Sequence, residues 1–242
     1  MAAKKSVAPT RYTFDNPPET LDGHPFYGLR LDEGQKNFRD TIWRGDKRII
    51  FCNARAGSGK TLVAVATANL LVQYQLYSKI IYICAGGVYE NRQGYLPGDL
   101  AQKSSLYSIP CVQALEKIGM NPARTIVYDG LLGDTASDGY VYCMTDAFVR
   151  GVNLGSEDER TIVIVEEAQN YTVQQLKTIL TRVNDAGLTI VIGHDKQCDI
   201  KPEHSGFVKY IRHFSDSDLA AYCELTECHR GKIADWADKL IS

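Results

Sequence analysis

Residues 54–61 read Ala-Arg-Ala-Gly-Ser-Gly-Lys-Thr, and this stretch decides the fold class. It follows the strand-like apolar run Arg48–Cys52 and opens the helical pattern Thr61–Tyr74. A glycine-rich turn between a strand and a helix lets backbone N–H groups surround a phosphate at the helix N-terminus. The stretch therefore predicts a P-loop, although Ala54 stands where the usual pattern has its first glycine.

The motif gives its last residues separate roles. Gly57 and Gly59 permit the tight turn, Lys60 is expected to reach the β- and γ-phosphates of ATP, and the Thr61 hydroxyl is expected to bind Mg²⁺. A chance glycine-rich turn is the alternative, which the preceding strand and the following helix disfavour. The predicted cradle comprises six residues: Ala56, Gly57, Ser58, Gly59, Lys60 and Thr61.

Short apolar runs rich in Ile and Val recur along the chain, with helical patterns such as Val173–Val183 between them. Such runs are typical of parallel strands that are covered on both faces. We therefore expect an α/β fold with a mainly parallel, doubly wound sheet, in one domain over residues 29–242. The expected strands are Arg48–Cys52, Lys79–Cys84, Thr125–Tyr128, Tyr140–Met144, Thr161–Val165, Leu188–Gly193 and Ala221–Leu225.

Residues 1–28 mix prolines, basic residues and aromatic residues without helical or alternating periodicity. This pattern predicts a loosely ordered N-terminal arm. Its aromatic side chains could anchor it on the core or on a neighbouring subunit.

The composition is that of an ordinary globular domain, with 44% hydrophobic and 23% charged residues. The net charge of -2 gives no global positive field for nucleic acid, although a local basic path stays open. Seven cysteines without a CxxC pair indicate reduced core thiols. No apolar run approaches the ~20 residues that span a bilayer. We therefore expect a cytoplasmic protein with no membrane segment.

A second motif, Ile-Val-Ile-Val-Glu-Glu at residues 162–167, is an apolar strand that ends in two carboxylates. In a parallel sheet these acids would lie at the edge that carries the cradle. Glu166 is expected to hold Mg²⁺, directly or through water, and Glu167 to polarise the attacking water. The alternative is a solvated start of a loop.

Once Glu-Glu-Ala-Gln-Asn at 166–170 is included, the chain resembles the PhoH-like family of P-loop ATPases, related to the core of superfamily-one helicases. The resemblance runs from about Leu31 to Leu240 and implies a RecA-like sheet. It rests on Gln35, Gly94–Leu100 with Lys103, Arg150-Gly151, Glu166–Asn170, Gly193 with Gln197, and His229-Arg230.

The resemblance also implies roles and partners. Gln35 would read adenine, and Gln169 and Gln197 would lie near the γ-phosphate; exposed or structural amides are the alternatives. The work substrate would be single-stranded RNA or another nucleic acid, and the assembly a homo-oligomeric, hexameric ring. The chain departs from the family at three positions: Glu166 replaces an Asp, Val152 replaces a second Arg, and His194 replaces an Asp.

Hydrolysis of ATP also needs positive charge on the transferring phosphoryl group, which an arginine commonly supplies. The chain has too few residues for a second RecA-like domain, so this arginine must come from the same domain or from another copy. Arg150 and Arg230 are the candidates, with a surface salt bridge as the alternative for each. An arginine supplied by a neighbour would favour a closed ring.

The sequence therefore favours a Mg²⁺-dependent ATPase, helicase-like by the resemblance, that couples hydrolysis to conformational work. A nucleotide or small-molecule kinase and an ATP-gated interaction module with little hydrolysis share the P-loop and stay open. The absence of an Asn-Lys-x-Asp sequence disfavours a GTPase. A further group of metal-ligating residue types has a spacing that matches no zinc pattern, so core thiols and surface histidines are favoured: His194, Asp195, Cys198, Cys223, Cys228 and His229.

Overall fold

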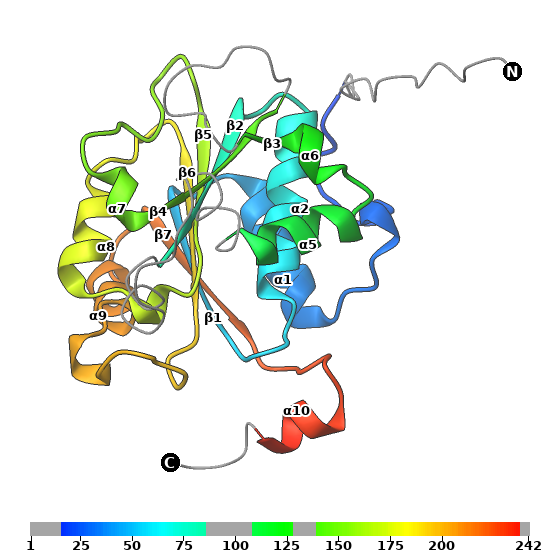
Figure 1. Ribbon diagram of the computed structural model, residues 1–242. Coiled ribbons are helices and arrows are strands. Elements are labelled where there is room, and N and C mark those ends of the chain that lie inside the picture. Colours follow the sequence, from blue (N-terminus) through cyan, green and yellow to red (C-terminus); the bar gives the residue numbers. More distant parts are fainter. Residues whose placement is uncertain (1–15, 86–107, 128–138, 238–242) are drawn as a thin grey trace, which may run out of the picture.

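A computed structural model of the chain describes residues 16–85, 108–127 and 139–237, and its centre is a parallel β-sheet with helices on both faces (Figure 1). The strand order is β3-β4-β2-β5-β6-β1-β7, and every neighbouring pair is parallel. The strands are β1 (Ile49–Ala54), β2 (Lys79–Cys84), β3 (Ile126–Val127), β4 (Val141–Thr145), β5 (Thr161–Val165), β6 (Leu188–Gly193) and β7 (Ala220–Leu225).

The helices divide into two layers (Figure 1). One face of the sheet carries α1 (Glu33–Arg44), α2 (Lys60–Gln73), α5 (Ile109–Lys117) and α6 (Pro122–Thr125). The other face carries α7 (Asp146–Val149), α8 (Val173–Leu180) and α9 (Phe207–Phe214). Short 3-10 turns are η1 (Phe26–Gly28), η2 (Ala168–Asn170) and η3 (Pro202–His204), and α10 (Lys232–Ala237) follows the last strand.

The predicted fold class is confirmed, and β2, β5 and β6 have the predicted bounds. Tyr128, the end of one predicted strand, lies outside the described residues. The helix predicted to reach Val183 ends at Leu180, because Val183 leaves the helix and bridges Leu154 instead. Its predicted start is confirmed, since Thr172 and Gln175 form a capping box.

Helix α2 explains why its sequence is apolar nearly all round. It packs between the sheet and helices α1 and α5, so every residue from Val63 to Val72 is buried. A helix that is buried on all sides has no polar face. This packing fixes the start of α2, and with it the cradle, at the carboxyl end of β1.

The later part of the predicted N-terminal arm packs on this layer. Leu21 and Phe26 are buried in the core, and the Trp43 indole N–H donates to the Pro18 carbonyl oxygen over 3.0 Å. Residues 1–15 lie outside the described part of the chain.

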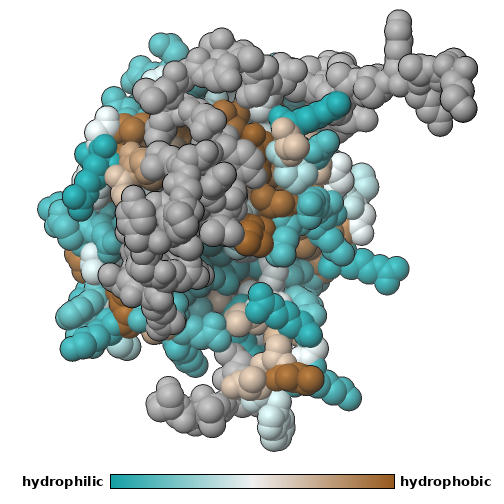
Figure 2. Space-filling model, viewed as in Figure 1, coloured by the Kyte–Doolittle hydropathy of each residue, from teal (hydrophilic) through white to brown (hydrophobic). Residues whose placement is uncertain are grey.

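At the other end of the chain, α10 projects from the body and carries apolar side chains at its surface (Figure 2). Ile233 is 88% exposed and Trp236 is 77% exposed. Among the described residues, no helix combines the length and the apolar character that crossing a membrane would require.

Candidate active site

The cradle adopts the backbone that its glycines predict. Gly57 has φ 75° and Gly59 has φ 77°, in the left-handed region that side chains with a Cβ disfavour. The chain also approaches both closely: a Cβ on Gly59 would lie 2.7 Å from Gln35 Nε2, and one on Gly57 would lie 2.8 Å from Arg230 Cγ. Both glycines are therefore required by conformation and by space.

Two acid–cradle contacts join the ends of β1 and β5, which β6 separates in the sheet. The Thr61 hydroxyl donates to Glu166 Oε1 over 2.9 Å, and Lys60 Nζ lies 3.1 Å from Glu167 Oε1. The structure thus brings together the four residues that the sequence assigned to Mg²⁺ and to the chemistry of hydrolysis. Each acid contacts a different cradle residue.

The two acids differ in environment. Glu166 is 4% exposed, and burial raises its pKa to about 7 despite the opposing charge of Lys60. Partial burial also opposes the charge of Glu167, but Lys60 and the Gln169 hydrogen bond outweigh it and lower its pKa. Burial likewise opposes the charge of Lys60, whose pKa is nevertheless raised by Glu167 and Glu166.

Buried polar atoms at this edge lack partners, which tests whether the residues fit a nucleotide and Mg²⁺. Within the described chain, three such atoms are Ser58 Oγ, Glu166 Oε2 and His194 Nδ1. Buried polar groups are normally hydrogen-bonded, and those that are not call for a ligand or a water. A carboxylate oxygen beside a threonine hydroxyl suits Mg²⁺, and a hydroxyl and an imidazole nitrogen suit phosphate oxygens or water. The residues present therefore fit this cofactor pair.

Gln169 connects Glu167 to the end of β6. Its Nε2 donates to Glu167 Oε2, and its Oε1 accepts from the His194 backbone N–H over 2.9 Å. Gly193 makes room for this contact, because a Cβ there would lie 2.9 Å from Gln169 Oε1. Glu167 itself has φ 51° and ψ 47°, which is unusual for a residue with a side chain and typical of functional sites.

Gln35 is a buried structural amide in this structure, 5% exposed. Its Oε1 accepts from the Asp32 backbone N–H, and its Nε2 donates to the Ser58 carbonyl oxygen over 2.9 Å. The first contact belongs to the capping box that starts α1. The amide thus supports the cradle directly, and one N–H of its NH₂ group is left for a ligand.

The segment Leu225–Gly231, here called the strap, continues from β7 across the cradle. Arg55 N donates to the Leu225 carbonyl oxygen over 2.9 Å, and His229 N donates to the Gly57 carbonyl oxygen over the same distance. Arg230 lies against Gly57, and its charge opposes that of Lys60. The sequence patterns named His229 and Arg230 as candidates without placing them beside the cradle, because the strap reaches the cradle through the pairing of β7 with β1.

Two further predicted residues, Gln197 and Arg150, are exposed. Gln197 is exposed, in a turn where its backbone N–H donates to the His194 carbonyl oxygen. Arg150 is exposed and lines a depression of about 330 Å³ on the α7–α8 face. That depression, here called the flank depression, is lined by Arg150, Gln174, Lys177, Thr178, Thr181 and Arg182. Residues 94–100 and Lys103 lie outside the described residues.

Comparisons with solved structures found helicase and terminase folds. The large terminase of bacteriophage HK97 aligns over 85% of this chain and 41% of its own, with 15% identity and a TM-score of 0.49. Pif1 helicase from Candida albicans aligns over 84% of this chain and 41% of its own, with 12% identity and a TM-score of 0.41.

Comparisons with curated proteins gave more direct relatives. Protein PhoH2 of Bacillus subtilis (strain 168) is 24% identical over 226 residues, which are 91% of this chain and 49% of that protein. Protein PhoH of Escherichia coli (strain K12) is 28% identical over 202 residues, 79% of this chain and 51% of that protein. The chain spans about half the length of these relatives. The profile of the family described as PhoH-like protein matches residues 30–241. Together with the P-loop and its acids, this match shows that the chain belongs to the PhoH-like protein family.

Proposed function

We propose that this chain is a Mg²⁺-dependent ATPase that couples hydrolysis to conformational work on single-stranded RNA or another nucleic acid. The observation that carries the ATPase half is the convergence of Lys60, Thr61, Glu166 and Glu167 at one edge of the sheet. Unpartnered buried atoms at the same edge support a phosphate and metal ligand there.

Bound Mg²⁺ would neutralise phosphate charge, with Thr61 and Glu166 as its protein ligands. Lys60 forms an ion pair with Glu167. On binding, the phosphates would attract Lys60 and free the Glu167 carboxylate. Glu167 would then accept a proton from the attacking water. Gln169, which is hydrogen-bonded to both Glu167 and His194, would couple a movement of Glu167 to the end of β6.

Arg230 is the better candidate for stabilising charge on the transferring phosphoryl group. It lies beside Gly57 of the same chain, whereas Arg150 lines the flank depression. We therefore propose Arg230 as an arginine supplied within the chain. Arg150 is left as the candidate for a contact with a neighbouring subunit or with nucleic acid.

The nucleic-acid half draws support from the flank depression. Three cations line it, with no acidic residue among the described lining residues, and such a patch suits a phosphate backbone. A hexameric ring is proposed on the family resemblance alone.

A nucleotide or small-molecule kinase would turn over ATP only with an acceptor for the phosphoryl group. An ATP-gated interaction module would bind ATP and hydrolyse little of it. Steady-state release of phosphate from Mg·ATP without any acceptor is the measurement that separates them, repeated with single-stranded RNA and with single-stranded DNA. We expect turnover without an acceptor and a rise in rate with nucleic acid. Absence of turnover with intact ATP binding would favour the gated module.

Lys60→Ala should abolish ATP binding or turnover and leave the fold intact, because the proposed role of Lys60 is to compensate phosphate charge. Circular dichroism checks the fold. Lys36→Ala, an exposed lysine of α1, is the matched control and should behave as wild type. Wild-type turnover in Lys60→Ala would overturn the P-loop assignment.

A further inference from the structure

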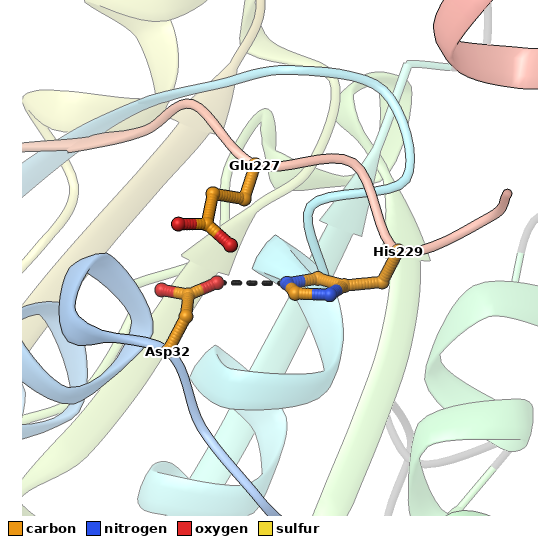
Figure 3. Close-up of side chains that lie close together, drawn as sticks. All are labelled: Asp32, Glu227 and His229. Atoms are coloured by element: carbon orange, nitrogen blue, oxygen red, sulfur yellow. Dashed lines mark hydrogen bonds and ion pairs between the residues drawn. The ribbon is translucent and has the colours of Figure 1, made fainter. Parts of the chain in front are cut away.

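Three side chains of types that can ligate a metal lie close together beside the cradle, one at the start of α1 and two on the strap. They are Asp32, Glu227 and His229, each with a ligand atom within 4.8 Å of the others (Figure 3). His229 Nε2 lies 2.7 Å from Asp32 Oδ2. Figure 3 shows the Glu227 carboxylate directed toward this pair.

The charges of this cluster are not balanced by its own members. Two carboxylates face each other, and like charges at such a distance repel. A protonated His229 would neutralise only one of them. Glu227 has no hydrogen-bond or ion-pair partner among the residues the structure describes, although it points at Asp32 rather than away from it. A divalent cation would neutralise both carboxylates and use the imidazole nitrogen.

The distances also suit a cation. Ligand atoms around a divalent metal lie about 2.0–2.2 Å from it, and therefore about 3 Å from one another. The Asp32–His229 contact already has that spacing. The ligand atom of Glu227 lies within 4.8 Å of the other two, and a three-ligand site would leave further positions for water.

We infer that Asp32, Glu227 and His229 form a binding site for a divalent transition metal, with Zn²⁺ as the representative ion. One imidazole and two carboxylates favour the series from Mn²⁺ to Zn²⁺ over Mg²⁺, which prefers oxygen ligands alone. This site is separate from the Mg²⁺ ligands Thr61 and Glu166.

The metal would act as a clip between distant parts of the chain. Asp32 Oδ1 accepts a hydrogen bond from the Gln35 backbone N–H over 2.7 Å. The His229 backbone N–H donates a hydrogen bond to the Gly57 carbonyl oxygen. A metal bound by Asp32 and the strap would therefore restrain the strap where Arg230 covers the cradle. The site holds whether or not the proposed hydrolysis takes place, since it needs no nucleotide.

The test is Zn²⁺ binding by the nucleotide-free, Mg²⁺-free, reduced full chain, in competition with a chromophoric chelator. We expect one tight equivalent, and Glu227→Gln and His229→Gln should each weaken it by at least about tenfold. Glu227→His should bind at least as tightly, because imidazole is a better zinc ligand than a carboxylate. Trypsin should cleave after Arg230 more slowly in the presence of Zn²⁺ in wild type, but not in Glu227→Gln.

Two controls separate this site from other zinc ligands. Glu157→Gln removes an exposed carboxylate before β5, and Cys228→Ser removes the thiol between two of the ligands; both should bind Zn²⁺ as wild type does. The inference is overturned if wild type binds no Zn²⁺, if Glu227→Gln binds it unchanged, or if only Cys228→Ser loses it. None of these measurements uses ATP, so a failure here is distinguishable from a failure of the ATPase proposal.

Discussion

The cradle and the flank depression both present positive charge, but they differ in what surrounds it. In the cradle, Lys60 faces the two carboxylates Glu166 and Glu167, and Arg230 stands nearby. In the flank depression, Arg150 and Lys177 have no ion-pair partner among the described residues. The Nε–H of Arg182 donates a hydrogen bond to the Val149 carbonyl oxygen, which positions the guanidinium group.

This difference distinguishes a site that can cleave a phosphate bond from a surface that can only bind phosphate groups. A site that cleaves a phosphate bond needs a base and metal ligands beside its cations, and the resulting acid–base contacts fix the geometry. A site that only holds a phosphate backbone needs cations and no acids, because an acid would repel the ligand. The cradle has the first composition and the flank depression has the second.

The largest expected difference between the cradle and the flank depression is in ATP turnover when the arginine of each is replaced. Arg230→Ala should lower ATP turnover by about 10³-fold or more, because an arginine at the transferring phosphoryl group is worth ~10³–10⁵ in rate. Arg150→Ala should leave turnover in the absence of nucleic acid close to wild type. Steady-state phosphate release measures both.

Mixing subunits decides whether the arginine acts within its own chain. Arg230→Ala mixed with Lys60→Ala should stay inactive, since neither subunit has a complete site. If turnover returns in that mixture, Arg230 acts on a neighbour. If Arg150→Ala is the inactive variant and is rescued by Lys60→Ala subunits, the assignment of the two arginines is reversed.

The next effect concerns the two acids. Glu167→Gln should retain ATP binding and lower turnover by about 10²–10⁴-fold, because an amide can hold the attacking water but cannot accept its proton. Fluorescent-nucleotide binding and single-turnover hydrolysis give the two readouts. A large loss in Glu166→Gln beside a nearly wild-type Glu167→Gln would exchange their roles.

A smaller effect is expected at the flank depression. Lys177→Ala should weaken binding to single-stranded RNA and reduce the slope of log K against log salt by about 1, as expected for one lost phosphate contact. ATP affinity should not change. Lys36→Ala, on the opposite helix layer, is the control, and an equal loss of slope in that variant would argue against the flank depression as the nucleic-acid surface.

The smallest expected effect comes from a variant that asks whether destabilising α8 also changes ATP binding at the cradle. Thr172→Ala removes the side-chain cap of α8 and should lower the free energy of unfolding by about 1 kcal/mol. ATP affinity should stay unchanged, because the cradle is fixed by α2 on the other face. Urea denaturation and nucleotide titration check the two statements, and a weakened ATP affinity would show that α8 supports the cradle.

The sequence predicted the parts of the site that are local in the chain. The P-loop lies between β1 and α2, and Glu166-Glu167 follow β5, so strand and turn patterns alone located them. Parallel pairing then places the ends of β1 and β5 at one edge, which accounts for the Thr61–Glu166 contact.

The parts that were not predicted depend on tertiary contacts. Gln35 was included in the predicted site only through the family resemblance, and its burial, which was not predicted, arises because α1 packs beside the cradle. The end of α8 at Leu180 was missed because Val183 pairs with Leu154, a contact that no helical period contains. Asp32 and His229 lie 197 residues apart, so no spacing rule joins them.

The position of the strap also bears on how the protein is made. A nascent chain emerges N-terminus first, and β1, α2 and β5 are synthesised well before β7. The strap follows β7 directly, β7 pairs with β1 at the edge of the sheet, and the strap is hydrogen-bonded to Gly57. A translation intermediate that ends before residue 220 therefore carries the P-loop and both acids without Arg230 above them. A chain that is terminated before residue 230 would therefore lack the arginine proposed for hydrolysis.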